Sequence, residues 1–168
     1  MTGREFLDRI QSLRVLIVGD ICLDRWCQYD PSLSDASKET NLPRIAVVAS
    51  EDTPGAAGTV ATNLSTLGAK TVAVLGVVGN DGHGFELLSS LRGRKIETDL
   101  LIQHSGVPTF TYTKLINKVT GIEDKPRVDF VLTDDLPSDV QEQVCARLRE
   151  YAANFDLICV SDQAETEY

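Results

Sequence analysis

The segment from Pro54 to Gly84, PGAAGTVATNLSTLGAKTVAVLGVVGNDGHG, decides the fold of this chain. It begins with small residues from Gly55 to Gly58, where the backbone can bend tightly and lie flush against a bound molecule. An amphipathic pattern then predicts a helix that ends at Gly68, and an apolar run predicts a strand from Lys70 to Val78. The glycines form either a ligand platform or ordinary turns of an α/β fold, and composition alone does not decide between the two.

Apolar runs that end in turns alternate with segments of helical spacing along the rest of the chain. The runs that predict strands are Arg14 to Asp20, Pro43 to Ala49, Leu100 to His104, Thr109 to Asn117 and Asp156 to Ser161, and the helical segments are Phe85 to Arg92 and the stretch opened by Pro137. The two runs between residues 100 and 117, together with the segment from Arg127 to Val131 that follows a loop, favour an antiparallel meander. Strands that alternate with helices predict an α/β architecture with a mainly parallel sheet.

Length and charge restrict the possible functions. With 168 residues and 42% hydrophobic content, the chain is long enough for one globular core, so residues 1–168 are expected to form a single domain. A net charge of −9 works against non-specific attraction to nucleic acid or to an anionic membrane. No apolar run approaches the roughly 20 residues of a membrane helix, and the first residues lack the apolar core of a secretory signal. We expect a cytoplasmic protein with a small-molecule ligand.

The four cysteines, at Cys22, Cys27, Cys145 and Cys159, show no CxxC pairing and no histidine at metal-ligand spacing. They are therefore expected to be buried thiols rather than a zinc site or disulfides. The two histidines are too few for a histidine metal cluster. The sequence predicts no metal site.

Asp24 lies five residues after Gly19, where the chain leaves the first predicted core strand. A carboxylate at this place can accept hydrogen bonds from two neighbouring sugar hydroxyls, or it can cap local backbone as a turn aspartate. Asp20 is expected to be a structural turn residue. Gly19 stands alone where a dinucleotide-binding fold needs GxGxxG, and no GxxxxGK[ST] loop is present. NAD binding is therefore disfavoured, and a P-loop kinase is excluded.

Taken together, the stretch GDICLDRW from Gly19 to Trp26 and the segment from Pro54 to Gly84 resemble the ribokinase, or PfkB, family of carbohydrate kinases. GDICLDRW most resembles the heptose-phosphate kinase branch. The resemblance runs from about Arg14 to Asp162 and covers the first half of such an enzyme. It implies a ribokinase-like α/β fold, with a mainly parallel sheet flanked by helices, a small β lid over about residues 25–50, and a C-terminal part missing from this chain.

The resemblance also implies a function, namely ATP-dependent phosphorylation of a sugar or sugar-like hydroxyl compound, with this chain supplying the sugar-binding half. The substrate-binding residues that it implies are Asp24, Gly55, Ala56 and Thr59. In the family the catalytic base and the anion hole come from a Gly-Ala-Gly-Asp motif in the C-terminal half, which does not occur in these residues. No catalytic residue is therefore assigned, and the sites for ATP and Mg²⁺ are expected outside this chain.

A non-catalytic sugar-binding or dimerising module of the same half-fold is the alternative function. Trp26 either packs in a core or, on a lid, helps to join two copies in a homodimer. The two functions differ in whether the reading frame continues past Tyr168 into a Gly-Ala-Gly-Asp motif. We expect residues 1–168 alone to phosphorylate nothing, and the strand from Asp156 to Ser161 to expose apolar surface.

Several residues depart from the heptose-phosphate branch. Ala56 replaces a second glycine, Thr59 replaces an asparagine that holds a sugar hydroxyl, and Gln163 and Glu165 replace a tyrosine and basic surroundings. Thr59 offers one hydroxyl in place of an amide, so its contact is weaker or mediated by water. Glu165 would repel a sugar phosphate. These departures predict a preference for a neutral sugar or nucleoside. In the same resemblance, Asp81 belongs to a GxDxxG turn, where it caps the next helix or contacts ligand.

Overall fold

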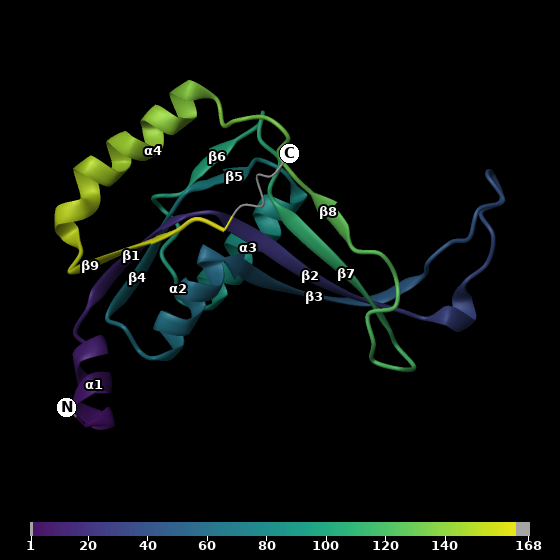
Figure 1. Cartoon of the computed structure of the whole chain (residues 1–168), viewed down its shortest axis with the longest axis horizontal. Coiled ribbons are helices and arrows are strands. Elements are labelled where there is room, and N and C mark those ends of the chain that lie inside the picture. The colour runs from purple at the N-terminus through teal and green to yellow at the C-terminus, as the bar shows by residue number, and fades with distance from the viewer. Residues whose placement is uncertain (1, 164–168) are drawn as a thin grey trace.

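The computed structural model describes residues 2–163 of the chain, and its centre is a core sheet of three parallel strands in the order β4-β1-β9 (Figure 1). These strands are β1 Arg14–Gly19, β4 Thr71–Leu75 and β9 Leu157–Ser161. The helices are α1 Gly3–Ile10, α2 Ala57–Thr66, α3 Gly82–Gly93 and α4 Ser138–Tyr151, with short 3-10 turns at Pro31–Leu33 and Ala152–Asn154.

Helices cover both faces of the central strand β1. Val15 and Ile17 pack in one apolar cluster with residues of α2 and α3, whereas Leu16 and Val18 pack in another with residues of α4. All four side chains are buried. Successive residues of a strand point to opposite faces, so an unbroken apolar run is what a strand covered on both sides needs. The prediction of an α/β fold with a mainly parallel core sheet is confirmed.

A second sheet, which we call the outer sheet, extends away from the core sheet (Figure 1). Its strand order is β3-β2-β7-β8, and β2 pairs antiparallel with β3 but parallel with β7. Its strands are β2 Ile21–Tyr29, β3 Val47–Ala56, β7 Thr111–Asn117 and β8 Val128–Phe130. Of residues 25–50, the end of β2 and the start of β3 belong to this sheet, and the segment between them forms an extended arm.

Two predictions about strands are corrected by the structure. The single strand predicted from Lys70 to Val78 breaks at Gly76 into β4 and β5 Val77–Gly79, which belong to different sheets. A Cβ on Gly76 would overlap the carbonyl oxygen of Gly19, so the chain can bend only because a glycine stands there. The antiparallel meander is only partly correct. β7 and β8 are antiparallel neighbours as predicted, but β6 Ile102–His104 pairs parallel with β5 and belongs to another sheet.

The edge strand β9 exposes apolar side chains, as the sequence predicted. It pairs with β1 on one side, and no described strand pairs with its other side. Leu157 and Ile158 are exposed, and Val160 is 75% exposed. Strands of parallel sheets are normally buried on both faces, so this edge is an unusual surface for such a sheet.

The close approach at Gly76 leads to a prediction about stability. Gly76→Ala should lower the free energy of unfolding by about 1 to 3 kcal/mol, because the new methyl group meets rigid backbone. Gly82→Ala is the matched control, since a Cβ there has no neighbour within 4 Å and alanine suits a helix. Urea denaturation of both variants measures their free energies of unfolding. Equal stability of the two would contradict the close approach of backbones at Gly76.

Candidate functional site

Asp24 and Gly55 lie beside each other on the paired strands β2 and β3. Cys22 stands opposite Gly55 and Asp24 opposite Thr53, so these side chains share one face of the outer sheet. A Cβ on Gly55 would lie 2.5 Å from Cys22 Sγ and 2.8 Å from Asp24 Oδ2. The missing side chain of Gly55 therefore leaves the space that the Asp24 carboxylate occupies.

Cys22, next to this carboxylate, is not a nucleophile. Burial, and after it the negative charge of Asp24, raise the pKa of the Cys22 thiol to about 12. The thiol therefore stays protonated at neutral pH, and a protonated thiol is unreactive. Asp24 is only half-buried, so its carboxylate can reach a ligand.

Ala56 connects β3 to α2 in an unfavourable backbone conformation. Its φ of 50° and ψ of −122° match the first central position of a type II′ turn, where glycine is normally found. As the N-cap residue of α2 it provides no side-chain hydrogen bond, and the backbone N–H of Ala57 instead donates to the carbonyl oxygen of Asp20 (2.9 Å). The departure from glycine that the sequence shows at this position therefore has a structural cost.

Thr59 lies in the first turn of α2 and is exposed. Its hydroxyl donates a hydrogen bond to the carbonyl oxygen of Pro54 (3.1 Å), so the hydroxyl proton is already used. What remains for a ligand is the ability to accept a hydrogen bond. This geometry agrees with the weaker contact that the sequence predicts for a threonine at this place.

Asp20 acts as a structural residue, as predicted. Its Oδ2 accepts a hydrogen bond from the backbone N–H of Gln163 (2.8 Å), and its carbonyl oxygen accepts from Ala57. These bonds tie the turn after β1 to the end of β9 and to the start of α2. Glu165, which entered the prediction about sugar phosphates, lies outside the described residues.

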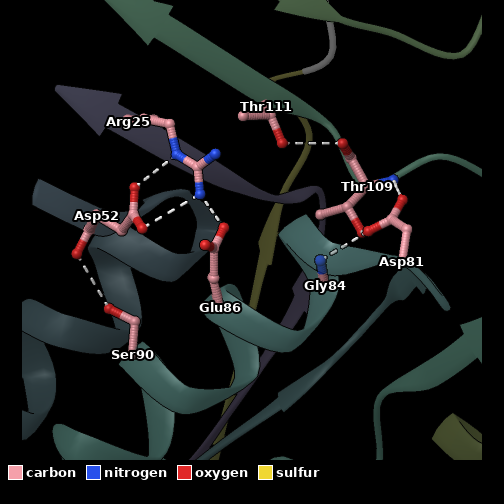
Figure 2. Close-up of polar contacts among 8 residues, drawn as sticks. All are labelled: Arg25, Asp52, Asp81, Gly84, Glu86, Ser90, Thr109 and Thr111. Carbon is pink, nitrogen blue, oxygen red and sulfur yellow. Dashed lines mark hydrogen bonds and ion pairs between the residues drawn. The ribbon is translucent and has the colours of Figure 1, made fainter. Parts of the chain in front are cut away.

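Asp81 caps the N-terminus of α3, which confirms the capping role predicted for the GxDxxG turn (Figure 2). Its carboxylate accepts from the backbone N–H of Gly84 (2.7 Å), the backbone N–H of Thr109 (2.9 Å) and the Thr109 hydroxyl (2.8 Å). Desolvation acts to raise the pKa of Asp81, but the hydrogen bonds from Thr109 and Gly84 outweigh it, so the pKa is lowered. A Cβ on Gly79 would lie 2.7 Å from the Thr109 nitrogen, and one on Gly84 would overlap the Gly79 carbonyl oxygen.

Arg25 joins the outer sheet to α3 on the face opposite to Asp24 (Figure 2). Its guanidinium donates to Asp52 on the neighbouring strand β3 (2.9 and 3.3 Å) and to Glu86 on α3. The Ser90 hydroxyl of the same helix donates to the backbone carbonyl of Asp52 (3.3 Å). The base of the outer sheet is thus fixed against the helix that Asp81 caps.

The face that carries Asp24 continues outward with aromatic and cationic side chains. The ammonium of Lys114 lies 4.0 Å from the ring centroid of Trp26, and the guanidinium carbon of Arg127 lies 4.8 Å from that of Tyr112. Trp26 is 39% exposed and does not pack in a core. Of these residues, the sequence predicts only Trp26 as a candidate interaction residue, because the face that the others share with it follows from strand pairing.

Two hollows lie close to these strands. One of about 390 Å³ lies at the outer end of the same face, where Trp26, Gln28, Glu51 and Ile116 are among its lining residues. The other, of about 340 Å³, lies at the carboxyl ends of β1 and β9, and its lining residues include Gly19, Gly76, Phe110 and Asp162. Ligands of open α/β sheets bind outside the carboxyl ends of the strands.

The histidine, cysteine and acidic side chains of the described residues form no metal site. Within residues 2–163, no group of three or more His, Cys, Asp or Glu side chains is placed to hold a metal ion. The four cysteines are free, and Cys145 is exposed on α4, so the expectation of burial is wrong for that residue. Among the described helices, none has the length and apolarity needed to cross a membrane.

The match to known proteins covers nearly the whole described chain. Residues 14–161 match the family of pfkB carbohydrate kinases. The chain belongs to this family. A crystal structure of a putative ribokinase from Agrobacterium tumefaciens superposes with a TM-score of 0.57 at 20% identity, over 89% of this chain and 44% of that one. The fold is therefore ribokinase-like.

Two curated relatives of this pfkB chain indicate its branch. It is 32% identical to the D-beta-D-heptose 7-phosphate kinase of Bordetella bronchiseptica, over 94% of this chain and 48% of that protein. It is 30% identical to the bifunctional protein HldE of Trichlorobacter lovleyi, over 92% of this chain and 30% of that protein. The chain thus spans about a third to a half of these relatives. The resemblance to the heptose-phosphate kinase branch is confirmed.

The structure brings three of the predicted substrate residues together. Asp24, Gly55 and Ala56 lie where β2 and β3 meet the start of α2, and Thr59 follows in the first turn of that helix. Contact between these residues and a sugar stays a prediction.

The conformation of Ala56 predicts a stabilising substitution. Ala56→Gly should raise the free energy of unfolding by about 1 kcal/mol, because glycine adopts positive φ without steric strain. Ala57→Gly is the control, since Ala57 is fully buried in the first turn of α2 and its replacement should lower stability by about 1 kcal/mol. Thermal melting of the three proteins compares them, and a loss at both positions would refute the strain at Ala56.

Proposed function

We propose that this chain supplies the sugar-binding half of an ATP-dependent carbohydrate kinase, which phosphorylates a sugar or a sugar-like hydroxyl compound. The observation that carries the proposal is the half-buried Asp24 carboxylate, which lies against Gly55 beside the start of α2. Membership of the pfkB family and the likeness to a heptose 7-phosphate kinase support it.

In this proposal Asp24 accepts hydrogen bonds from two neighbouring sugar hydroxyls. A carboxylate has the acceptor capacity to do so, and the hydrogen bonds to a charged group are stronger than those between neutral groups. Gly55 lets the sugar approach the backbone, Ala56 continues that surface, and the Thr59 hydroxyl accepts one further hydrogen bond. The catalytic base and the anion hole come from the Gly-Ala-Gly-Asp motif of the family, which does not occur in this chain. The sites for ATP and Mg²⁺ likewise lie outside the residues of this chain.

Replacement of Asp24 tests the sugar contact. Asp24→Ala should weaken sugar binding by about 1.5 to 3 kcal/mol, because a charged hydrogen-bond acceptor is lost. Isothermal titration of the natural-length protein with sugars and sugar phosphates, heptose 7-phosphate included, measures the change. Glu142→Ala is the control, since Glu142 is exposed on α4. A folded Asp24→Ala variant that binds every ligand as the unaltered protein does would refute the assignment.

A non-catalytic, dimerising module remains the second candidate, and exposed apolar side chains of the outer sheet favour it. Trp26, Val47, Val48 and Val128 are each between 39% and 49% exposed. Exposed apolar side chains can take part in an interface between proteins, although Val128 lies on the Arg25 face of the sheet and Trp26 on the Asp24 face. In this candidate two copies pair through their outer sheets as a homodimer.

Residues 1–168 purified by themselves should consume no ATP in the presence of sugars. The Gly-Ala-Gly-Asp motif is absent from these residues, and one group that stabilises the transferring phosphate is often worth about 2 to 4 kcal/mol. The exposed apolar edge of β9 should make the same polypeptide self-associate. Coupled ATP assays and analytical ultracentrifugation measure both properties. Sugar-dependent ATP turnover by a monodisperse monomer would overturn this reading.

A further inference from the structure

Arg25 follows Asp24 directly on β2, and its guanidinium is shared by two carboxylates (Figure 2). Its Nε and Nη2 donate to Asp52 of β3 (2.9 and 3.3 Å), and Nη2 also donates to Glu86 of α3. The Arg25 and Asp52 side chains are 19% and 22% exposed, and that of Glu86 is 41% exposed. One positive charge thus faces two negative charges, so the loss of either carboxylate leaves a balanced ion pair.

The two carboxylates restrain different movements of the outer sheet. Asp52 stands directly opposite Arg25 in the pairing of β2 with β3, so this ion pair stays within the sheet and supports its register. Glu86 lies on α3, so its ion pair with Arg25 crosses from the sheet to the helix. The Ser90 hydroxyl adds a second link, because it donates to the backbone carbonyl oxygen of Asp52 (3.3 Å). The side chains that restrain the tilt of the sheet on α3 are therefore Glu86 and Ser90.

α3 is in turn joined to α2, the helix that follows Gly55. Ala61 of α2 packs in the same buried cluster as Leu87 and Leu91 of α3. The Ser65 hydroxyl of α2 donates to the carbonyl oxygen of Arg94, the C-cap residue of α3 (2.7 Å). An outer sheet that is held on α3 is thus also held relative to α2.

We propose that Arg25, through its ion pair with Glu86, is a positioning residue for the Asp24 site, so that sugar affinity depends on a contact on the opposite face of the same strand. This inference rests on the proposed function. Asp24 lies on the outer sheet and Thr59 on α2, so a sugar that contacts both needs a fixed angle between sheet and helix. A sheet that tilts freely has to be ordered when the sugar binds, and this cost lowers the affinity.

The test is isothermal titration of the natural-length protein with the panel of sugars and sugar phosphates used for Asp24. Glu86→Ala should weaken binding on the order of tenfold, because the tilt is released while the pair of Arg25 with Asp52 stays balanced. Glu86→Gln should recover part of this loss, since its amide oxygen can still accept a hydrogen bond from Arg25. Glu142→Ala makes the same change at an exposed position of α4 and should bind as the unaltered protein does.

A double-mutant cycle with Asp24→Ala separates positioning from a general loss of stability. In the Asp24→Ala protein, Glu86→Ala should change the affinity by less than about twofold, because no carboxylate remains to be positioned. An equal loss of affinity with and without Asp24 would refute the positioning role, in favour of an ion pair that only stabilises the fold. If Glu86→Ala does not fold, Glu86→Gln takes its place in the same cycle.

The same titrations distinguish failure of this inference from failure of the proposed function. If Asp24→Ala weakens binding and Glu86→Ala does not, the hydroxyl clamp stands and the positioning role of Arg25 is refuted. If Asp24→Ala binds every sugar as the unaltered protein does, or if the unaltered protein binds none of them, the proposed function is refuted and this inference with it.

Discussion

The arrangement of both sheets depends on a close approach of backbones at Gly19. This residue has a φ of 144°, and a Cβ on it would overlap the carbonyl oxygen of Ser161 on the neighbouring strand β9. Gly76, at the end of β4, approaches Gly19 from the other side. The three core strands can therefore end together without side chains between them. At this point β1 continues into β2 and β4 into β5, so the glycines determine where the outer sheet leaves the core.

A second constraint holds the outer sheet in place after it leaves the core. Arg25 is bound by two carboxylates, Asp52 within the sheet and Glu86 on α3, and its side chain is mostly buried. A buried ion pair gains little net stability over an apolar contact, but removal of one partner leaves an uncompensated charge. The cluster therefore holds the angle between the outer sheet and α3. The ring contact of His83 on α3 with Phe130 on β8 supports the same angle from the far edge of the sheet.

Much of the core was predictable because its strands are covered on both faces. An unbroken apolar run such as β1 has few alternatives, and the spacing of α4 shows its apolar stripe directly. The break at Gly76 was not predictable, because the apolar run continues through it and only the approach of Gly19 explains the bend. The parallel pairing of β7 with β2 was also hidden, since segments far apart in sequence pair according to the whole fold. The position of Lys114 beside Trp26 could not be predicted, because it depends on this pairing.

The candidate site was partly predictable because its first half is local in sequence. Asp24 and Gly55 belong to short motifs, whereas their contact depends on the register of β2 against β3. A slip of one residue in this register would turn Asp24 toward α3 and Arg25 toward the open face. Two features prevent the slip, namely the space left by Gly55 for the Asp24 carboxylate and the bidentate contact of Arg25 with Asp52. Alternate residues of β2 thus have different surroundings, because one face is anchored to α3 through Arg25 and the other carries the half-buried Asp24 and the exposed Trp26.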